Sequence, residues 1–129
     1  MNRKQKGTAG ERELVHAFWS FGWPCIRVAG SGSNRYPSPD LLTGHDGRML
    51  AIECKTIAGD KKYFSKEEID NLKFFAREFG AEPYVTIRFG KIWYFFSLDD
   101  LEEKDNTFLA SLEMAKMKAM LIEELIQSF

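Results

Sequence analysis

The sequence of 129 residues has no apolar run long enough to cross a membrane. A membrane-spanning helix needs about 18 or more consecutive apolar residues, and the longest apolar runs here are much shorter. The first residues, MNRKQKG, also lack the apolar core of a secretory signal. We therefore expect a single domain over residues 1–129 that is located in the cytoplasm and does not bind membranes.

Cysteine and histidine are scarce. Cys25 and Cys54 both lie in apolar, strand-like runs, which is typical of buried free thiols in a reducing compartment. His16 and His45 are isolated in the sequence, and we interpret both as structural. No zinc-ligand spacing, phosphate-binding glycine loop or internal repeat is present. The sequence therefore gives no support for a zinc site, a P-loop enzyme or a repeat protein.

Positive charge is scarce in the second half of the chain. Residues 1–62 hold ten Lys and Arg against six Asp and Glu, whereas residues 63–129 hold eight against thirteen. The two halves therefore carry formal charges of +4 and −5. We expect only the first half to bind an anionic partner.

The most informative stretch is PDLLTGHDGRMLAIECK, residues 39–55. Asp46-Gly47 predicts a two-residue hairpin turn, because a type I′ turn needs positive φ at both central residues. Pairing outward from this turn places Asp40 opposite Glu53. Two carboxylates roughly 5 Å apart repel by roughly 3 kcal/mol at an effective dielectric of about 20. Lys55 projects from the same face as Glu53, so the hairpin predicts a site for a hard divalent cation beside a base, as in metal-assisted hydrolysis.

The N-terminal region is expected to add another carboxylate. We interpret residues 1–7 as a mobile basic arm and Thr8-x-x-Glu11 as the capping box that begins a helix. On this helix Glu11 shares the apolar face with Phe18, whereas Glu13 points to solvent. Glu11 is thus either a helix cap or a functional carboxylate directed at the sheet, and the second role is favoured because a carboxylate on an apolar face needs a partner.

The remaining elements follow from local patterns. The expected elements are a strand at Cys25–Ala29, loops at Gly30–Ser38 and Ala58–Tyr63, a helix between Ser65 and Gly80, strands at Tyr84–Phe89 and Lys91–Ser97, and a helix over residues 107–127. This order predicts an α/β fold with a mixed central β-sheet flanked by helices. The first loop leads into Asp40, so it is either a linker or a functional loop beside the site.

Two of the expected helices carry many apolar residues, and each set needs a surface to pack against. The Ser65–Gly80 helix has more apolar surface than one sheet face can cover, which implies a partner surface at Leu72, Phe74, Phe75 and Phe79. In the C-terminal helix, Met114, Met117 and Leu121 recur at helical spacing and are interpreted as core, with a role in dimerisation as the alternative.

The stretches KGTAGERELV, RVAGSGS, PSPD and AIECK together resemble the archaeal Holliday-junction resolvase family, Hjc, within the PD-(D/E)xK nuclease superfamily. The resemblance covers roughly residues 4–96. It implies a restriction-endonuclease-like fold and a homodimeric endonuclease that cuts four-way DNA junctions. It also implies dependence on Mg²⁺, one or two ions per subunit, with Mn²⁺ as a substitute.

The resemblance, the hairpin geometry and the basic first half of the chain together assign roles to individual residues. Asp40 and Glu53 would bind the metal, with the Cys54 backbone carbonyl as a further oxygen ligand, and Glu11 would support the metal or its waters. Lys55 would position or deprotonate the attacking water. The family's loop serine falls on Ser31, its helix arginine on Arg12, and its interface phenylalanines on Phe75 and Phe79. The candidate DNA-binding residues are Lys4, Lys6, Arg12, Arg27, Arg35, Lys61 and Lys62.

Two other functions remain open at this point. The first is another PD-(D/E)xK nuclease, mismatch-nicking or restriction-like, which would cut linear duplex DNA. The second is a non-catalytic DNA-binding protein that keeps the fold, with the carboxylates and Lys55 as surface ion pairs. The position of Glu11 on an apolar helix face argues against this second function.

Overall fold

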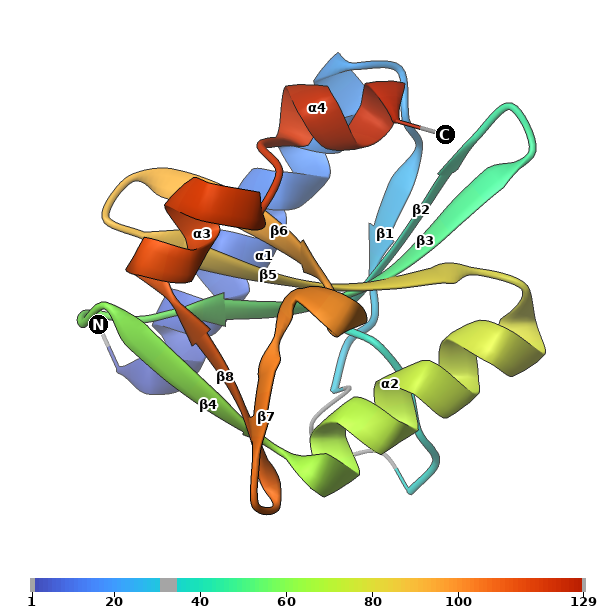
Figure 1. Cartoon of the computed structure of the whole chain (residues 1–129). Coiled ribbons are helices and arrows are strands. Elements are labelled where there is room, and N and C mark those ends of the chain that lie inside the picture. The colour runs from blue at the N-terminus through green and yellow to red at the C-terminus, as the bar shows by residue number, and fades with distance from the viewer. Residues whose placement is uncertain (1, 31–34, 129) are drawn as a thin grey trace.

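The computed structural model describes residues 2–30 and 35–128, apart from the side chains of Arg3 and Lys4. A five-stranded sheet in the order β1-β2-β3-β5-β6 forms its centre (Figure 1). The strands are β1 (Cys25–Arg27), β2 (Leu41–His45), β3 (Arg48–Thr56), β5 (Glu82–Phe89) and β6 (Ile92–Ser97). Neighbouring strands are antiparallel except for the parallel pair β3–β5. The expected mixed sheet is confirmed.

Helices cover both faces of this sheet. The helix α1 (Arg3–Ser20) packs on one face, where Leu14 and Phe18 join a core that also contains Leu125 from the C-terminal region. The helix α2 (Lys66–Phe79) packs on the opposite face, where Ile69 and Leu72 join a second core. Cys25 and Cys54 are buried and free, as expected, and burial raises the pKa of Cys25 to about 11.

The hairpin that carries the candidate site forms as predicted. Asp46 and Gly47 have φ angles of 51° and 84°, so the turn has the two left-handed residues of a type I′ geometry. His45 pairs with Arg48, and the register continues to the pair Leu41 and Ile52. Asp40 directly precedes Leu41 and Glu53 directly follows Ile52, so this register brings the two carboxylates to the same end of the hairpin. The local turn therefore fixes which side chains reach the site.

The helix α2 also has the predicted ends. The Ser65 hydroxyl accepts a hydrogen bond from the Glu68 backbone N–H at 3.0 Å, which satisfies one of the unpaired donors of the first turn. Gly80 ends the helix in the left-handed conformation with φ of 83°, where a side chain would be strained.

The start of α1 was predicted wrongly. The helix begins at Arg3, so residues 3–7 are helical and do not form a mobile arm. Asn2 caps it by accepting a hydrogen bond from the Gln5 backbone N–H at 2.9 Å, while the Gln5 side chain bonds back to Asn2. This capping box precedes the one expected at Thr8, and the Lys, Arg and Gln residues between them favour helix.

The C-terminal region was also predicted wrongly. In place of one helix over residues 107–127 it forms β8 (Thr107–Ser111), α3 (Leu112–Lys118) and α4 (Ile122–Gln127). The chain leaves the helix between α3 and α4 because Met120 pairs with Phe95 of β6 through two backbone hydrogen bonds of 2.8 and 2.9 Å. Met117 is consequently 79% exposed and does not belong to the core.

A second, three-stranded sheet accounts for the remaining differences. It has the order β4-β8-β7, with β4 at Lys61–Ser65 and β7 at Glu102–Lys104. The segment expected as a polar loop at Ala58–Tyr63 therefore contains the start of a strand. Its partner β8 lies more than forty residues away in sequence, so no local pattern marks the pairing. Among the helices of the described part of the chain, none is long and apolar enough to cross a membrane.

Candidate active site

Asp40 holds the centre of the candidate site. It lies immediately before β2 and is buried. Its backbone N–H donates to the Ile52 carbonyl at 3.0 Å, and its Oδ2 accepts the Cys54 backbone N–H at 2.8 Å. The carboxylate is therefore fixed against β3 between the positions of Glu53 and Lys55, where the hairpin register predicted it.

Each of the two glutamates at the site faces a cation. Glu53 Oε2 lies 4.0 Å from Lys55 Nζ, two residues farther along β3. Glu11 reaches the site from α1, and its Oε1 lies 3.4 Å from Arg27 Nη1 on β1. Glu11 therefore points toward the sheet, as its place on the apolar helix face predicted.

Burial and the charge of Asp40 raise the pKa of both glutamates. Burial, followed by the nearby Asp40 charge, raises the pKa of Glu53 to about 8. The same two causes raise the pKa of Glu11 above its ordinary value, against the opposing effect of Arg27. Ionisation of the two glutamates is therefore unfavourable in this site, even with Arg27 and Lys55 nearby.

The described residues contain no group of three or more His, Cys, Asp and Glu side chains arranged to hold a metal ion. The contacts explain this arrangement, because Glu11 faces Arg27, Glu53 faces Lys55, and Asp40 accepts a backbone N–H. The chemistry of the donors nevertheless fits a hard divalent cation, which prefers carboxylate and carbonyl oxygens. A bound cation would also favour the ionised form of Glu53, which burial and the Asp40 charge disfavour.

Close packing places α1 relative to the catalytic strand. A Cβ added at Gly10 would lie 2.6 Å from Thr56 Oγ1 and 3.2 Å from the Trp93 ring, so only glycine permits this approach. Glu13 was expected to point to solvent. Although half-exposed, it accepts a hydrogen bond from Trp93 Nε1 at 3.1 Å and lies 3.9 Å from Arg88 Nη1.

These contacts anchor α1 on both sides of Glu11. Sequence reasoning missed Gly10, Trp93 and Arg88 because their partners are distant in sequence. Arg88 is unusual in that its Nε is buried without a hydrogen-bond partner among the described residues.

The candidate DNA-binding residues fall on two sides of the molecule. Arg12 and Lys6 are exposed on α1, Arg27 is on the adjacent β1, and Arg35 is exposed with its guanidinium 5.6 Å from the Tyr36 ring. Ser31 lies outside the described residues, as does the side chain of Lys4.

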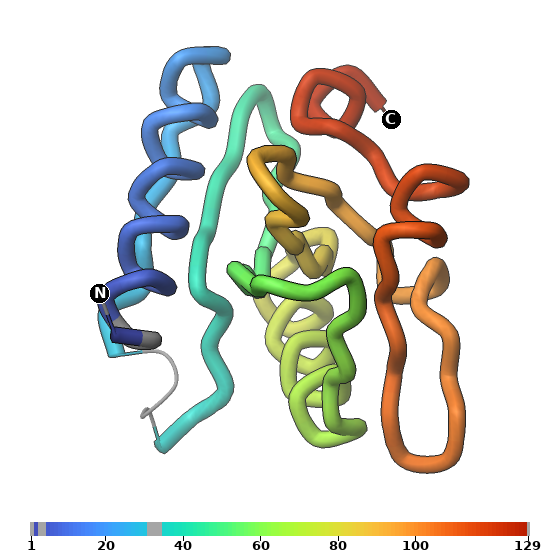
Figure 2. The backbone as a smooth tube through the Cα atoms, turned by 90° about the vertical axis from the view of Figure 1, so that its left-hand side faces the viewer, coloured from blue at the N-terminus to red at the C-terminus, as the bar shows by residue number. Residues whose placement is uncertain are grey.

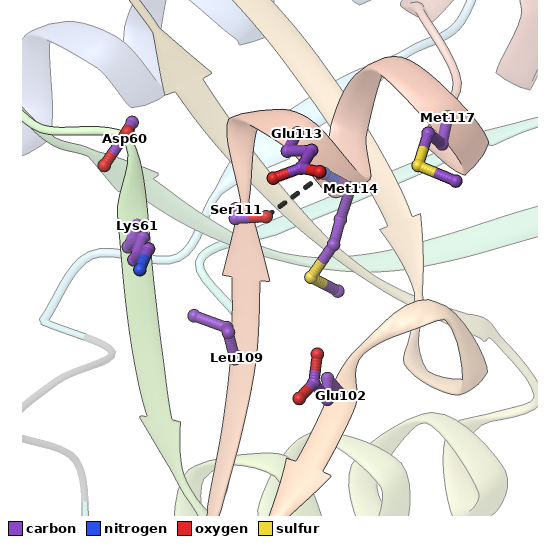
Figure 3. A pocket seen from close by; sticks show the side chains of 8 residues that line it. All are labelled: Asp60, Lys61, Glu102, Leu109, Ser111, Glu113, Met114 and Met117. Carbon is purple, nitrogen blue, oxygen red and sulfur yellow. Dashed lines mark hydrogen bonds between the residues drawn. The ribbon is translucent and has the colours of Figure 1, made fainter.

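Lys61 and Lys62 are on β4 instead. Lys61 lines a hollow of about 300 Å³ together with the carboxylates of Asp60, Glu102 and Glu113 (Figure 3). The elements around this hollow, β7, β8 and α3, lie on the side of the molecule opposite α1 (Figure 2). The structure thus does not group Lys61 with Arg12 and Arg27.

Part of the apolar surface expected on α2 is exposed. Phe75 and Phe79 stack with ring centroids 5.0 Å apart, and Phe79 is exposed. Phe74 is exposed as well, with the Arg77 guanidinium 5.6 Å from its ring. Leu72 was wrongly assigned to this surface, since it is buried in the second core. The α2 patch therefore consists of Phe74, Phe75 and Phe79.

Comparison with known proteins shows the family of this chain. The family model for the archaeal Holliday junction resolvase, Hjc, matches residues 2–129. The chain belongs to the Hjc family. A relative from Archaeoglobus fulgidus, named crossover junction endodeoxyribonuclease Hjc, is 42% identical over 106 residues, covering 81% of this chain and 78% of the relative. The Sulfolobus acidocaldarius Hjc is 33% identical over 130 residues, covering 98% of this chain and 90% of the relative.

A solved structure supports the same relationship. It is described as Archaeoglobus fulgidus Hjc, a Holliday junction resolvase from an archaeal hyperthermophile. It matches this fold with a TM-score of 0.86 and 36% identity, covering 92% of this chain and 96% of that chain. The Hjc relationship also includes the C-terminal region, which the resemblance based on residues 4–96 did not reach.

Proposed function

We infer that this protein is a structure-selective DNA endonuclease that resolves four-way junctions by paired nicks. The observation that carries this inference is the convergence of Asp40, Glu53 and Lys55 beside Glu11, in a chain that belongs to the Hjc family. Relatives at up to 42% identity are named crossover junction endodeoxyribonucleases. The reaction is hydrolysis of a DNA phosphodiester.

We further propose that the hydrolysis depends on Mg²⁺, with Mn²⁺ as a substitute. Asp40 and Glu53 would hold one or two ions, with the Cys54 backbone carbonyl as an additional oxygen ligand, and Glu11 would support the metal or its waters. A bound divalent ion supplies Lewis-acid stabilisation and lowers the pKa of a coordinated water. The oxygen-only donor set and the raised pKa of Glu53 support this assignment.

Lys55 is proposed to act on the attacking water and on the phosphate. Its ammonium lies on the same strand face as Glu53 and is partly exposed, so a phosphate can approach it. A positive charge at this position orients the water and stabilises the additional negative charge of the transition state. Ser31, which precedes Asp40 by nine residues in the sequence, is proposed as a further contact of the site.

The DNA is proposed to approach from the side of α1 and β1. Arg12, Arg27 and Arg35 lie on this side, and their charges attract the phosphate backbone without regard to sequence. The opposite side carries the acidic hollow around Lys61. This distribution agrees with the charge difference between the halves of the chain.

The protein is proposed to act as a two-fold homodimer. Two strands of a four-way junction must be cut for resolution, and a two-fold dimer supplies two sites related by the same symmetry. The α2 patch supports this proposal because it exposes stacked aromatic rings. Burying such rings is a common source of interface energy.

The test is cleavage of a labelled four-way junction and of a linear duplex with the same sequence, with Mg²⁺ and with EDTA. We expect paired nicks in the junction with Mg²⁺, little cleavage of the duplex and none with EDTA. Asp40→Asn is the matched control, expected to bind the junction without cutting it. Equal cleavage of the duplex would indicate a restriction-like or mismatch-nicking nuclease, and binding without cleavage in Mg²⁺ and Mn²⁺ would indicate a non-catalytic DNA-binding protein.

A further inference from the structure

The outward face of α1 ends in an exposed tryptophan that the proposed chemistry does not use. Arg12, His16 and Trp19 follow one another at helical spacings of four and three residues and are all exposed, so they line one face of the helix. Trp19 is 55% exposed, whereas Trp23 and Trp93 are buried. An exposed indole beside a basic residue is a feature of nucleic-acid contacts.

The indole of Trp19 is fixed in place. Its Nε1–H donates to the backbone carbonyl of Cys25 at 3.0 Å. Cys25 belongs to β1, which is an edge strand of the central sheet, so the ring is attached to the scaffold and yet remains largely exposed. A ring held in this way loses little conformational freedom when it binds a ligand.

The distance from the catalytic residues matches a short stretch of DNA. Glu11 and Trp19 are eight residues apart on one helix, which corresponds to about 12 Å along its axis. This equals the rise of about three to four base pairs. DNA that places a phosphate near Glu11 and Arg12 would therefore bring bases a few pairs away toward Trp19.

We propose that Trp19 is a stacking platform for a base exposed at the branch point of the junction. In a linear duplex each interior base is stacked between its neighbours, whereas at a branch point the arms separate and base faces become accessible. Stacking on Trp19 would therefore favour the junction over the duplex, while Arg12 contacts the phosphate backbone of either. This role rests on the proposed function and adds a residue that determines its substrate selectivity.

The surroundings of Trp19 favour DNA as its partner. The neighbouring charged side chains on this face and on β1 are Arg12 and Arg27, which attract phosphate. Arg12 on this face directly follows Glu11, which reaches the candidate active site. A purely structural role is the alternative, since the indole covers part of the free edge of β1 and so protects it from pairing.

The first measurement is acrylamide quenching of tryptophan fluorescence, because Trp19 is the exposed indole. In an Asp40→Asn background, where the junction is bound without cleavage, we expect the junction to protect Trp19 more strongly than a duplex of the same sequence. Equal protection by both DNAs, or no protection at saturation, would overturn the proposal.

The second measurement is affinity in matched variants. Trp19→Ala should weaken junction binding about 5- to 150-fold, the effect of losing one base–aromatic stack, and leave duplex binding within about twofold. Trp19→Phe keeps a stacking ring without the Nε1 donor and should restore most of the affinity. Tyr63→Ala is the control, because Tyr63 is an aromatic residue of similar exposure, 54%, on the distant β4.

Folding and assembly are checked in the same variants by circular dichroism and sedimentation. If the Trp19→Ala variant folds and binds the junction normally, Trp19 only protects the β1 edge and does not contact DNA. An equal loss on junction and duplex would make it a general DNA contact, and a loss of dimers would make it an interface residue. Each of these results overturns the proposal. Junction cleavage by the unaltered protein tests the proposed function separately.

Discussion

Replacing Glu53 with Gln removes the charge that the site accommodates least well. Moving a carboxyl pKa from 4.5 to about 8 corresponds to at most about 5 kcal/mol of unfavourable free energy when the carboxylate is ionised. Because the folded pKa is the higher one, this cost appears as pH rises above 4.5 and is complete above pH 8. At pH 7 it amounts to about 3 kcal/mol.

We therefore expect metal-free Glu53→Gln to be more stable than the unaltered protein by up to about 3 kcal/mol at pH 7, with a smaller difference near pH 5. Urea unfolding followed by circular dichroism in EDTA at pH 5, 7 and 8.5 measures this difference. Mg²⁺ should then stabilise the unaltered protein more than the variant, since a ligand stabilises the state that binds it. The variant should also bind the junction without cutting it.

Two results would refute this reasoning. A variant less stable than the unaltered protein at pH 7 without metal would show that burial and the Asp40 charge do not make ionised Glu53 unfavourable. Junction cleavage near the normal rate would show that Glu53 is not a metal ligand. Glu67→Gln is the control, because Glu67 is an exposed acid in the first turn of α2: its removal should lower stability by at most about 1 kcal/mol, through the lost helix-dipole interaction, and leave cleavage unchanged.

Three further predictions follow from the surfaces and the packing of α1. In a salt titration of junction binding, Arg12→Ala should reduce the magnitude of the slope of log K, the binding constant, against log salt concentration by about one unit. Lys61→Ala should leave this slope unchanged, because Lys61 lies in the acidic hollow. Phe79→Asp should give folded monomers that do not make paired nicks, and a folded dimer in sedimentation would place the interface elsewhere. Gly10→Ala should lower stability by about 1–3 kcal/mol through its clash with Thr56, seen as a lower Tm, and an unchanged Tm would refute the close packing.

The centre of the site could be predicted because it depends on local geometry. The Asp46-Gly47 turn and the alternation of side chains along a strand were sufficient to bring Asp40 and Glu53 together and to place Lys55 on the same face. Both effects act over a few residues, so no knowledge of the remaining fold was required.

The predictions that were wrong depend on contacts between segments that are distant in sequence. Residues 107–127 have helical apolar spacing, but the pairing of Met120 with Phe95 and of β8 with β4 overrides it. These pairings join segments distant in sequence, and local propensity is a weak guide where tertiary contacts compete with it. The contact of Glu13 with Trp93 was missed for the same reason.

The partners of the carboxylates explain how the site is stable before any cation binds. Arg27 faces Glu11, Lys55 faces Glu53, and a backbone N–H bonds to Asp40. An incoming divalent cation competes with Arg27 and Lys55 for the glutamates, and a DNA phosphate competes with the glutamates for the same two cations. Each ligand therefore releases the groups that the other one binds. By linkage, cation and DNA are expected to increase each other's affinity.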